Sequence, residues 1–357
     1  MRYLSSPDFR HDGAERIGVL LANSGTPDSL SVRDVRRFLA AFLSDPRVVE
    51  LPRAVWLAIL HGLILRTRPR RSARKYAKIW TAQGSPLASL SRDLRSALMG
   101  RLAERVLAPF SLELGMLYSR PTIGEALERL RSLGAQRVLI VPLFPQYCGA
   151  STGSVYDRVA AELERWRWLP ELRFIAEYHD YPGYIESLRA SVEQHWQEHG
   201  RTRHLLVSFH GVPERNFHLG DPYFCKCQKT ARLLADELML KEHEWTVSFQ
   251  SRVGPAKWLQ PYTSEVVAQL PARGIDRLTV ICPGFAVDCL ETLEEIDIEN
   301  RDRFLRAGGR EFQYVPALNA RPEHAGFLAD LIARHCQGWT QVELGFRPAS
   351  AARGTSA

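Results

Sequence analysis

The feature that most constrains the fold of this 357-residue chain is a regular alternation of short apolar runs with helical stretches. Eight of these runs have the length and composition of buried strands. They are Ile17–Ser24, Leu112–Tyr118, Arg137–Phe144, Leu172–Tyr178, His204–Phe209, Trp245–Gln250, Leu278–Cys282 and Phe312–Val315. Because helical patterns separate successive runs, the chain is expected to form parallel sheets with right-handed crossovers.

The strands divide evenly between the two halves of the chain. This predicts an α/β protein of two similar Rossmann-like domains, each a roughly four-stranded parallel sheet flanked by helices. The similarity of LGAQRVLIVPLF to the later RGIDRLTVICPGF supports a duplication. We place the domains at residues 1–178 and 179–321, expect a helix at about 322–340 to pack back on the first domain, and expect a disordered tail at 347–357.

Such domains face each other across a cleft, and the carboxyl ends of their strands border it. The run Leu278–Cys282 is followed by Pro283 and Gly284 and, from about Asp288, by an acidic helical pattern. At α-helical spacing, Asp288, Glu291 and Glu295 fall within about 60° on one face. Three carboxylates repel one another unless a cation or a proton lies among them. A solvated acidic face is the alternative, but the position after a strand favours function.

A second candidate is His210, at the end of a predicted strand. Gly211 and Pro213 predict a tight turn that directs its imidazole into the cleft, although a purely structural histidine is the alternative. An imidazole beside an acidic face could hold a divalent metal ion, or it could provide a base and a proton path. Both interpretations are open at this point.

The basic residues are concentrated in one segment. The formal net charge is +7, and seven cations follow the apolar stretch Ala54–Leu65 within thirteen residues: Arg66, Arg68, Arg70, Arg71, Arg74, Lys75 and Lys78. A basic segment beside an apolar one suits a membrane surface or an anionic substrate. We expect no nucleic-acid partner, because the chain has no helix-turn-helix, zinc-finger or RNP signature.

Other classes are excluded by missing motifs. No G-x-G-x-x-G follows a strand and no P-loop occurs, so a dinucleotide or nucleotide site is not expected. No run of eighteen apolar residues predicts a membrane span, and Met1–Arg10 lacks a signal-peptide core, so we expect a cytoplasmic protein. Six cysteines in a chain of this length do not indicate a disulfide framework, and Cys225-Lys226-Cys227 lacks a second pair for a metal site.

Several further motifs occur in order from about residue 17 to 335. They are Asn23-Ser24-Gly25-Thr26-Pro27, Phe42-Leu43-Ser44-Asp45-Pro46-Arg47-Val48-Val49, Gly84-Ser85-Pro86-Leu87, Phe144-Pro145-Gln146-Tyr147, Ser208-Phe209-His210-Gly211-Val212-Pro213, Gly220-Asp221-Pro222-Tyr223, Gln250-Ser251-Arg252 and Glu291-Thr292-Leu293-Glu294-Glu295. Taken together, these motifs resemble those of the ferrochelatase family, of bacterial type.

The resemblance implies a lyase that inserts Fe²⁺ into protoporphyrin IX with release of two protons, the last step of haem biosynthesis. It makes His210 and Glu291 the metal-site pair, with Asp288 and Glu295 continuing an acidic catalytic path. The implied substrate-binding residues are Ser24, Arg68, Ser85 and Tyr147. A cobalt chelatase of the same fold and a non-catalytic porphyrin or metal carrier are the alternatives.

The chain also departs from the family pattern. Cys289 stands two residues before the key glutamate, where many members have histidine, and Ser24 replaces a usual leucine or methionine. Only Cys336 lies in the C-terminal region where some members bind a [2Fe–2S] cluster. We therefore expect no cluster and no tightly bound cofactor, with Fe²⁺ as a substrate. Peripheral contact with an anionic inner-membrane surface is expected, and a monomer and a homodimer are both open.

Overall fold

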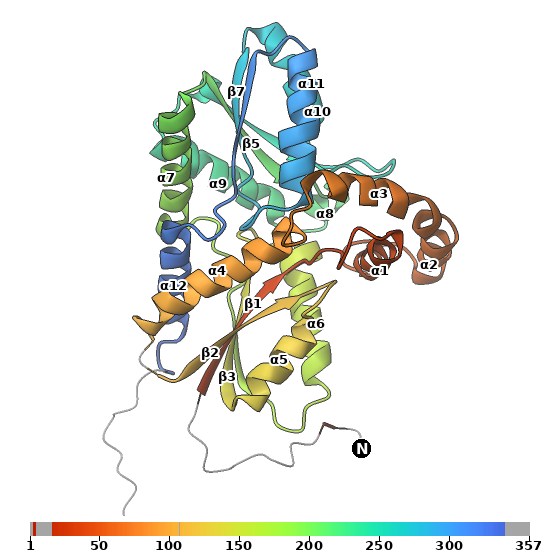
Figure 1. Ribbon diagram of the computed structural model, residues 1–357, viewed down its shortest axis with the longest axis vertical. Helices are drawn as coiled ribbons and strands as arrows, with labels where there is room; N and C mark the ends of the chain where they lie inside the picture. Colours follow the sequence, from red (N-terminus) through yellow and green to blue (C-terminus); the bar gives the residue numbers. More distant parts are fainter. Residues whose placement is uncertain (1–2, 5–15, 107, 340–357) are drawn as a thin grey trace, which may run out of the picture.

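The computed structural model describes residues 3–4, 16–106 and 108–339, so the proposed tail at 347–357 lies outside the described residues. The chain forms two parallel sheets, one above the other in Figure 1. The first consists of β1 (Arg16–Asn23), β2 (Phe110–Met116), β3 (Ala135–Pro142) and β4 (Glu171–Phe174). The second consists of β5 (His204–His210), β6 (Trp245–Gln250), β7 (Arg277–Ile281) and β8 (Glu311–Val315).

The two sheets have the same topology. Their strand orders are β2-β1-β3-β4 and β6-β5-β7-β8, and every pairing between these strands is parallel. Strands buried on both faces need continuous apolar runs, and Leu20, Leu21, Leu206 and Val207 are all fully buried. The prediction of two four-stranded parallel sheets flanked by helices is confirmed.

Helices cover both sheets. In the N-terminal half (residues 16–178) they are α1 (Val32–Leu43), α2 (Arg53–Ile59), α3 (Leu65–Ile79), α4 (Pro86–Ala103), α5 (Ile123–Ser132) and α6 (Ser154–Leu163), with the short π-helices η1 (Leu60–Ile64) and η2 (Gly149–Gly153). In the C-terminal half (residues 179–339) they are α7 (Pro182–His199), α8 (Glu214–His218), α9 (Tyr223–Glu237), α10 (Thr263–Gln269), α11 (Arg301–Arg306) and α12 (Pro322–His335), with the π-helix η5 (Glu291–Asn300) and two 3₁₀ turns, η3 (Glu242–Glu244) and η4 (Pro271–Arg273).

The carboxyl ends of the strands of the two sheets lie toward each other. The Gly149 N–H, after β3, donates to the Asp221 carboxylate at 2.8 Å, and Asp221 follows β5. Residues from the strand ends of both sheets are therefore in contact, as the cleft interpretation requires.

The segment between β1 and α4 projects from the first sheet and reaches the second half of the molecule (Figure 1). The apolar stretch Ala54–Leu65 and the basic residues that follow it lie on one helical segment, because α2, η1 and α3 run without interruption from Arg53 to Ile79. Near position 65 the exposed side chains of this segment change from apolar to basic, but no break in the helical segment separates them.

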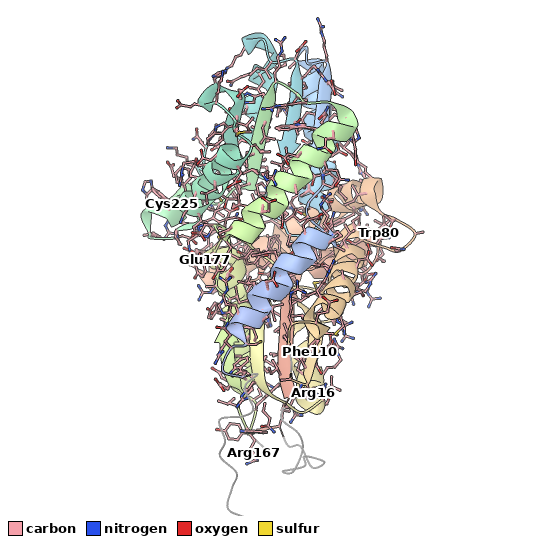
Figure 2. All side chains as sticks on the ribbon, turned by 90° about the vertical axis from the view of Figure 1, so that its left-hand side faces the viewer. Arg16, Trp80, Phe110, Arg167, Glu177 and Cys225 are labelled. Carbon is pink, nitrogen blue, oxygen red and sulfur yellow. The ribbon has the colours of Figure 1, made fainter. Side chains whose placement is uncertain are left out.

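The last helix returns to the first half. Figure 2 shows α7 and α12 on the same side of the molecule, and α12 packs against α4. Leu94 and Leu98 of α4 share one apolar cluster with Leu328 and Leu331 of α12. The domain boundaries at residues 178 and 321 stay predictions.

Candidate active site

His210 is the last residue of β5, and its imidazole is half-buried. The ring lies 6.4 Å from that of Phe285, measured between centroids. Its Nδ1 lies 2.6 Å from the Gly211 carbonyl oxygen. A carbonyl can only accept, so Nδ1 carries the proton in this bond, and in the neutral imidazole Nε2 keeps a lone pair. That lone pair can take a proton or bind a metal ion.

The acidic segment after β7 is a π-helix, η5, which continues directly as α11. Asp288 precedes it and lies in no helix, so the prediction that Asp288 shares an α-helical face with Glu291 and Glu295 is wrong. Hydrogen bonds in a π-helix join residues five apart, so Glu291 and Glu295 lie within one turn of each other. Such helices are rare and often occur at functional sites.

Three titratable groups converge where β5 and η5 meet. Burial raises the pKa of the Glu295 carboxyl; the nearby Glu291 charge adds to this, while hydrogen bonds from Ser251 and the charge of His210 oppose it. His210 and Glu291 are thus both close enough to Glu295 to act on it electrostatically. The structure brings together three of the four residues predicted to be catalytic.

Asp288 has a different environment. Its buried carboxylate accepts hydrogen bonds from Tyr314 Oη at 2.6 Å, Thr292 Oγ1 at 2.8 Å, Asn319 Nδ2 at 2.8 Å and the Ala317 N–H at 3.3 Å. Four donors on one buried carboxylate satisfy its acceptor capacity. These contacts join the start of η5 to β8 and the segment after it.

The N-terminal half contributes a cation and a phenol to the same place. Burial lowers the pKa of the Arg68 guanidinium, and the charge of Glu291 partly offsets this effect. Burial also raises the pKa of Tyr76 well above its usual value, with the Glu291 charge adding to it. Both residues belong to α3, so α3 places Arg68 and Tyr76 near Glu291 of the other half, the glutamate predicted to belong to the metal site.

The hydroxyl groups of Thr26 and Ser85 lie next to Tyr76 in the N-terminal half. The Tyr76 hydroxyl lies near Thr26, and Thr26 Oγ1 donates to Ser85 Oγ at 2.7 Å. Since Ser85 accepts this bond, its own proton remains available for donation. Thr26 and Ser85 are both buried. A cluster of hydroxyls beside a guanidinium is suited to an anionic group such as a carboxylate.

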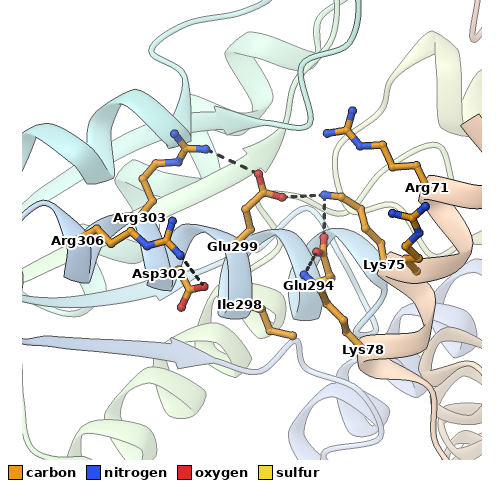
Figure 3. Close-up of a pocket in the computed structure, with 10 residues that line it drawn as sticks. Arg71, Lys75, Lys78, Glu294, Ile298, Glu299, Asp302, Arg303 and Arg306 are labelled. Atoms are coloured by element: carbon orange, nitrogen blue, oxygen red, sulfur yellow. Dashed lines mark hydrogen bonds and ion pairs between the residues drawn. The ribbon is translucent and has the colours of Figure 1, made fainter.

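Two lysines of α3 bind the outer part of η5. Lys75 Nζ and Lys78 Nζ each lie 2.9 Å from a different oxygen of the buried Glu294 carboxylate, and Lys75 also reaches Glu299 at 2.7 Å. The four residues that form these bonds line part of a pocket of about 580 Å³, shown in Figure 3. The remaining lining residues are Arg71, Arg74, Ile298, Asp302, Arg303 and Arg306. The two halves are therefore joined by ion pairs directly outside the site.

The remaining predicted substrate residues lie elsewhere in the cleft region. Ser24 follows β1, and its carbonyl accepts the Tyr118 N–H at 3.0 Å. Tyr147 follows β3, and Lys226 Nζ lies 5.6 Å from its ring centroid. Ser24 and Tyr147 are both partly exposed, and they lie after the carboxyl ends of two neighbouring strands. Their contact with substrate stays a prediction.

Cys289 lies near Glu291, at the position where many family members have a histidine. Burial raises the pKa of its thiol, and the Glu291 charge adds to this. All six cysteines are free thiols, with Cys225 exposed and Cys227 buried. Within the described residues no group of three or more His, Cys, Asp and Glu side chains forms a complete metal site.

Comparison with known proteins identifies the class. The fold resembles that of the sirohydrochlorin chelatase SirB from Bacillus subtilis subspecies spizizenii in complex with cobalt, with a TM-score of 0.53 at 11% identity over 91% of this chain and 97% of that one. CbiX, the terminal enzyme for biosynthesis of sirohaem in denitrifying bacteria, matches with a TM-score of 0.50 at 16% identity over 89% and 98%. The fold is that of the chelatases.

The sequence identifies the family. The family model for ferrochelatase matches residues 16–336. The ferrochelatase of Nitrosococcus oceani is 53% identical over 345 residues, 97% of this chain and 94% of the relative. That of Thioalkalivibrio sulfidiphilus is 51% identical over 346 residues, with the same two coverages. The chain belongs to the ferrochelatase family. It is a lyase of haem biosynthesis that inserts ferrous iron into a porphyrin, as predicted.

Proposed function

We propose that this enzyme inserts Fe²⁺ into protoporphyrin IX in the cleft, with His210 and Glu291 as the metal-site pair. The observation that carries the assignment is the convergence of His210, Glu291 and Glu295 from the C-terminal half with Arg68 and Tyr76 from the other half. One side offers groups that accept protons and bind a hard cation, and the other offers groups that bind an anion.

The proton chemistry belongs to the C-terminal half. A porphyrin loses two pyrrole protons when it takes up a divalent ion, so the site needs a base and an exit for protons. His210 Nε2 is free for this purpose because Nδ1 is engaged by Gly211. The raised pKa of Glu295 brings that carboxyl closer to the working pH, where it can accept a proton and pass it outward.

The porphyrin-binding role belongs to the N-terminal half. Protoporphyrin is flat and apolar and carries two propionate groups, which require cations or hydroxyl donors at the edge of an apolar cleft. Arg68 and Ser85 supply these groups, and we assign Ser24 and Tyr147 to the wall of the porphyrin pocket. We keep Asp288 in the site as the residue that anchors the start of η5, the helix that carries Glu291 and Glu295.

A peripheral membrane contact is also proposed. Leu51, just before α2, and Val55, Ile59 and Leu63, on α2 and η1, recur every four residues, and 50%, 57%, 40% and 61% of their surfaces are exposed. Exposed arginines follow on α3, and no helix in the described part of the chain is long and apolar enough to span a bilayer. An apolar stripe followed by cations suits the surface of an anionic leaflet. We place this surface on the cytoplasmic face of the inner membrane.

Vesicle co-sedimentation tests the membrane contact. The wild-type protein is expected to bind phosphatidylcholine vesicles that contain phosphatidylglycerol, with binding that weakens as salt rises, because each basic residue contributes ~1 kcal/mol near an anionic surface. Leu63→Asp should reduce binding, whereas Leu169→Asp, at another site 57% exposed, should not. Equal losses in the two variants would contradict the assignment of α2 and η1.

The function itself is tested by incubating the protein with protoporphyrin IX and Fe²⁺ without oxygen and recording the absorbance. A ferrochelatase specific for this substrate gives repeated turnover to protohaem. Coproporphyrin and Co²⁺ in parallel reactions define the preferred macrocycle and metal. Faster turnover with coproporphyrin would contradict the substrate assignment, and turnover with Co²⁺ alone would contradict the metal assignment.

A further inference from the structure

Two adjacent residues, Gln250 at the end of β6 and Ser251 directly after it, contact the segments that carry His210, Glu291 and Glu295. Gln250 lies opposite His210 in the sheet. Its carbonyl accepts the Gly211 N–H at 2.8 Å, which fixes the turn directly after His210. Its side-chain amide donates to the Glu291 carbonyl at 2.8 Å, at the first residue of η5. A single buried residue, Gln250, thus contacts the backbone next to His210 and the backbone of the proposed metal-site residue Glu291.

The orientation of the Gln250 amide is determined by its partners. The Glu291 carbonyl can only accept, so the NH₂ group faces η5 and Oε1 faces Ser208. Ser208 Oγ donates to that oxygen at 2.8 Å. Ser208 has then used its proton, so Thr263 donates to Ser208 at 2.9 Å and Ser248 donates to Thr263 at 2.8 Å. This chain of buried hydroxyls holds the amide in one position.

Ser251 holds the second carboxylate. Its N–H lies 2.7 Å from Glu295 Oε1 and its hydroxyl 2.5 Å from Oε2, so one residue supplies donors to both oxygens. Ser251 has φ = +66°, in the left-handed region that residues other than glycine rarely adopt. Such conformations persist only where the surroundings impose them, and they cluster at functional sites.

We propose that Gln250 and Ser251 are positioning residues for metal insertion: they set the spacing between His210, Glu291 and Glu295. The proposal rests on the proposed roles of those three residues. Gln250 fixes the backbone on both sides of the site, and Ser251 fixes the Glu295 side chain. Neither residue needs to touch the substrate for its loss to slow the reaction, because a displacement of about 1 Å at a reacting group can cost ~10²-fold in rate.

The chain offers a matched control for Gln250. Gln313 is also a buried glutamine in the same sheet, and its amide donates to the carbonyls of His199 and Gly200 at 3.1 and 3.0 Å, at the other end of α7 from the cleft. Gln250→Met and Gln313→Met therefore remove the same chemistry from two places. Both variants should lose similar thermal stability, but only one removes contacts with the site.

The test measures kcat, the KM for protoporphyrin and the melting temperature of both variants. We expect Gln250→Met to lower kcat by ~10–100-fold with a KM within threefold of wild type, and Gln313→Met to keep kcat within twofold. Equal kcat values for the two variants would overturn the role of Gln250. Glu291→Gln is assayed alongside: if it retains full activity, the proposed metal-site role of Glu291 fails, and this outcome is separate from the result for Gln250.

Ser251 provides a second test in case Gln250→Met does not fold. Ser251→Ala and Ser251→Gly both lose the hydroxyl donor, but only glycine adopts φ = +66° without strain. We expect Ser251→Gly to be the more stable of the two, with both variants slowed by a similar factor of at least fivefold. If Ser251→Gly recovers wild-type kcat, Ser251 acts through stability alone and the positioning role is wrong.

Discussion

The segments that follow β1 and β5 occupy equivalent places in two sheets of the same strand order, yet they carry different chemistry. At the end of β5, the chain presents His210 as the last residue of the strand. After β1, it presents Ser24 and then extends through α1, α2 and α3, so that Arg68 and Tyr76 reach the cleft from more than forty residues away. We propose that the two similar halves are divided in function, with the chemistry in the C-terminal half and substrate binding in the N-terminal half.

This division predicts which kinetic constant each substitution changes. Loss of a group in the C-terminal half should lower kcat with little effect on porphyrin affinity. Loss of a group in the N-terminal half should mainly raise the KM for porphyrin. The predictions below follow in order of expected effect.

Glu291→Gln is expected to lower kcat by more than ~10³-fold while porphyrin still binds. The amide keeps the shape of the side chain but removes the negative charge, so it can neither attract a cation nor accept a proton. Steady-state assays combined with porphyrin fluorescence quenching measure both quantities. A variant that lost porphyrin affinity instead of turnover would place Glu291 on the binding side of the comparison.

Glu295→Gln is expected to have a smaller effect, ~10–10²-fold in kcat. Glu295 lies within one turn of Glu291 on η5 and is held by Ser251, which suits a relay position more than a ligand position. The same assays apply. Losses of equal size in the Glu291 and Glu295 variants would contradict a graded path.

Arg68→Met is expected to raise the KM for protoporphyrin by about tenfold with kcat within threefold. A hydrogen bond to a charged group such as a propionate contributes about 1.5–3 kcal/mol, and the lower end of this range corresponds to about tenfold. The methyl ester of the porphyrin is the control, since it lacks the carboxylate and should bind the wild type and the variant alike. A fall in kcat alone would place Arg68 with the chemistry.

The smallest effect concerns a second histidine, His324, which is fully buried at the start of α12. Its Nδ1 donates to the Asn319 carbonyl at 2.7 Å, and burial lowers its pKa from 6.5 to about 4. A lowered folded-state pKa contributes stability above pH 6.5 that is lost as pH falls toward 4. At 1.36 kcal/mol per pKa unit the loss is at most roughly 3 kcal/mol.

The check compares free energies of unfolding in urea for the wild type and His324→Asn between pH 7.5 and 4.5. Asparagine keeps a donor near the Nδ1 position but does not titrate. The variant should lose less stability on acidification than the wild type, with kcat at pH 7.5 within twofold. Identical pH profiles would mean that His324 does not govern acid stability.

The arrangement of strands was predictable because buried parallel strands leave continuous apolar runs, and these runs also locate His210 and the acidic segment. The π-helix was not predictable, because its apolar and acidic residues fit α-helical spacing equally well. That error placed Asp288 on a face with Glu291, whereas it lies before the helix among four donors.

Contacts between distant segments were also missed. The basic cluster was visible as charge alone, and nothing in its pattern indicated that Lys75 and Lys78 bind Glu294 or that Tyr76 approaches Glu291. A tyrosine on the buried face of an otherwise basic helix was the available signal. Likewise, the motif Gln250-Ser251-Arg252 was noticed, but its role required the hydrogen bonds to Glu291 and Glu295.

His210 is proposed to act in metal insertion as a base or as a ligand of Fe²⁺, and the His210→Ala variant is the sharpest test of this role. Turnover, porphyrin affinity and melting temperature are measured on the same preparation. Alanine can neither accept a pyrrole proton nor bind Fe²⁺, so we predict a fall in kcat of at least ~10²–10⁴-fold with affinity and melting temperature nearly unchanged. A stable His210→Ala protein that inserts iron within tenfold of the wild-type rate would contradict this account.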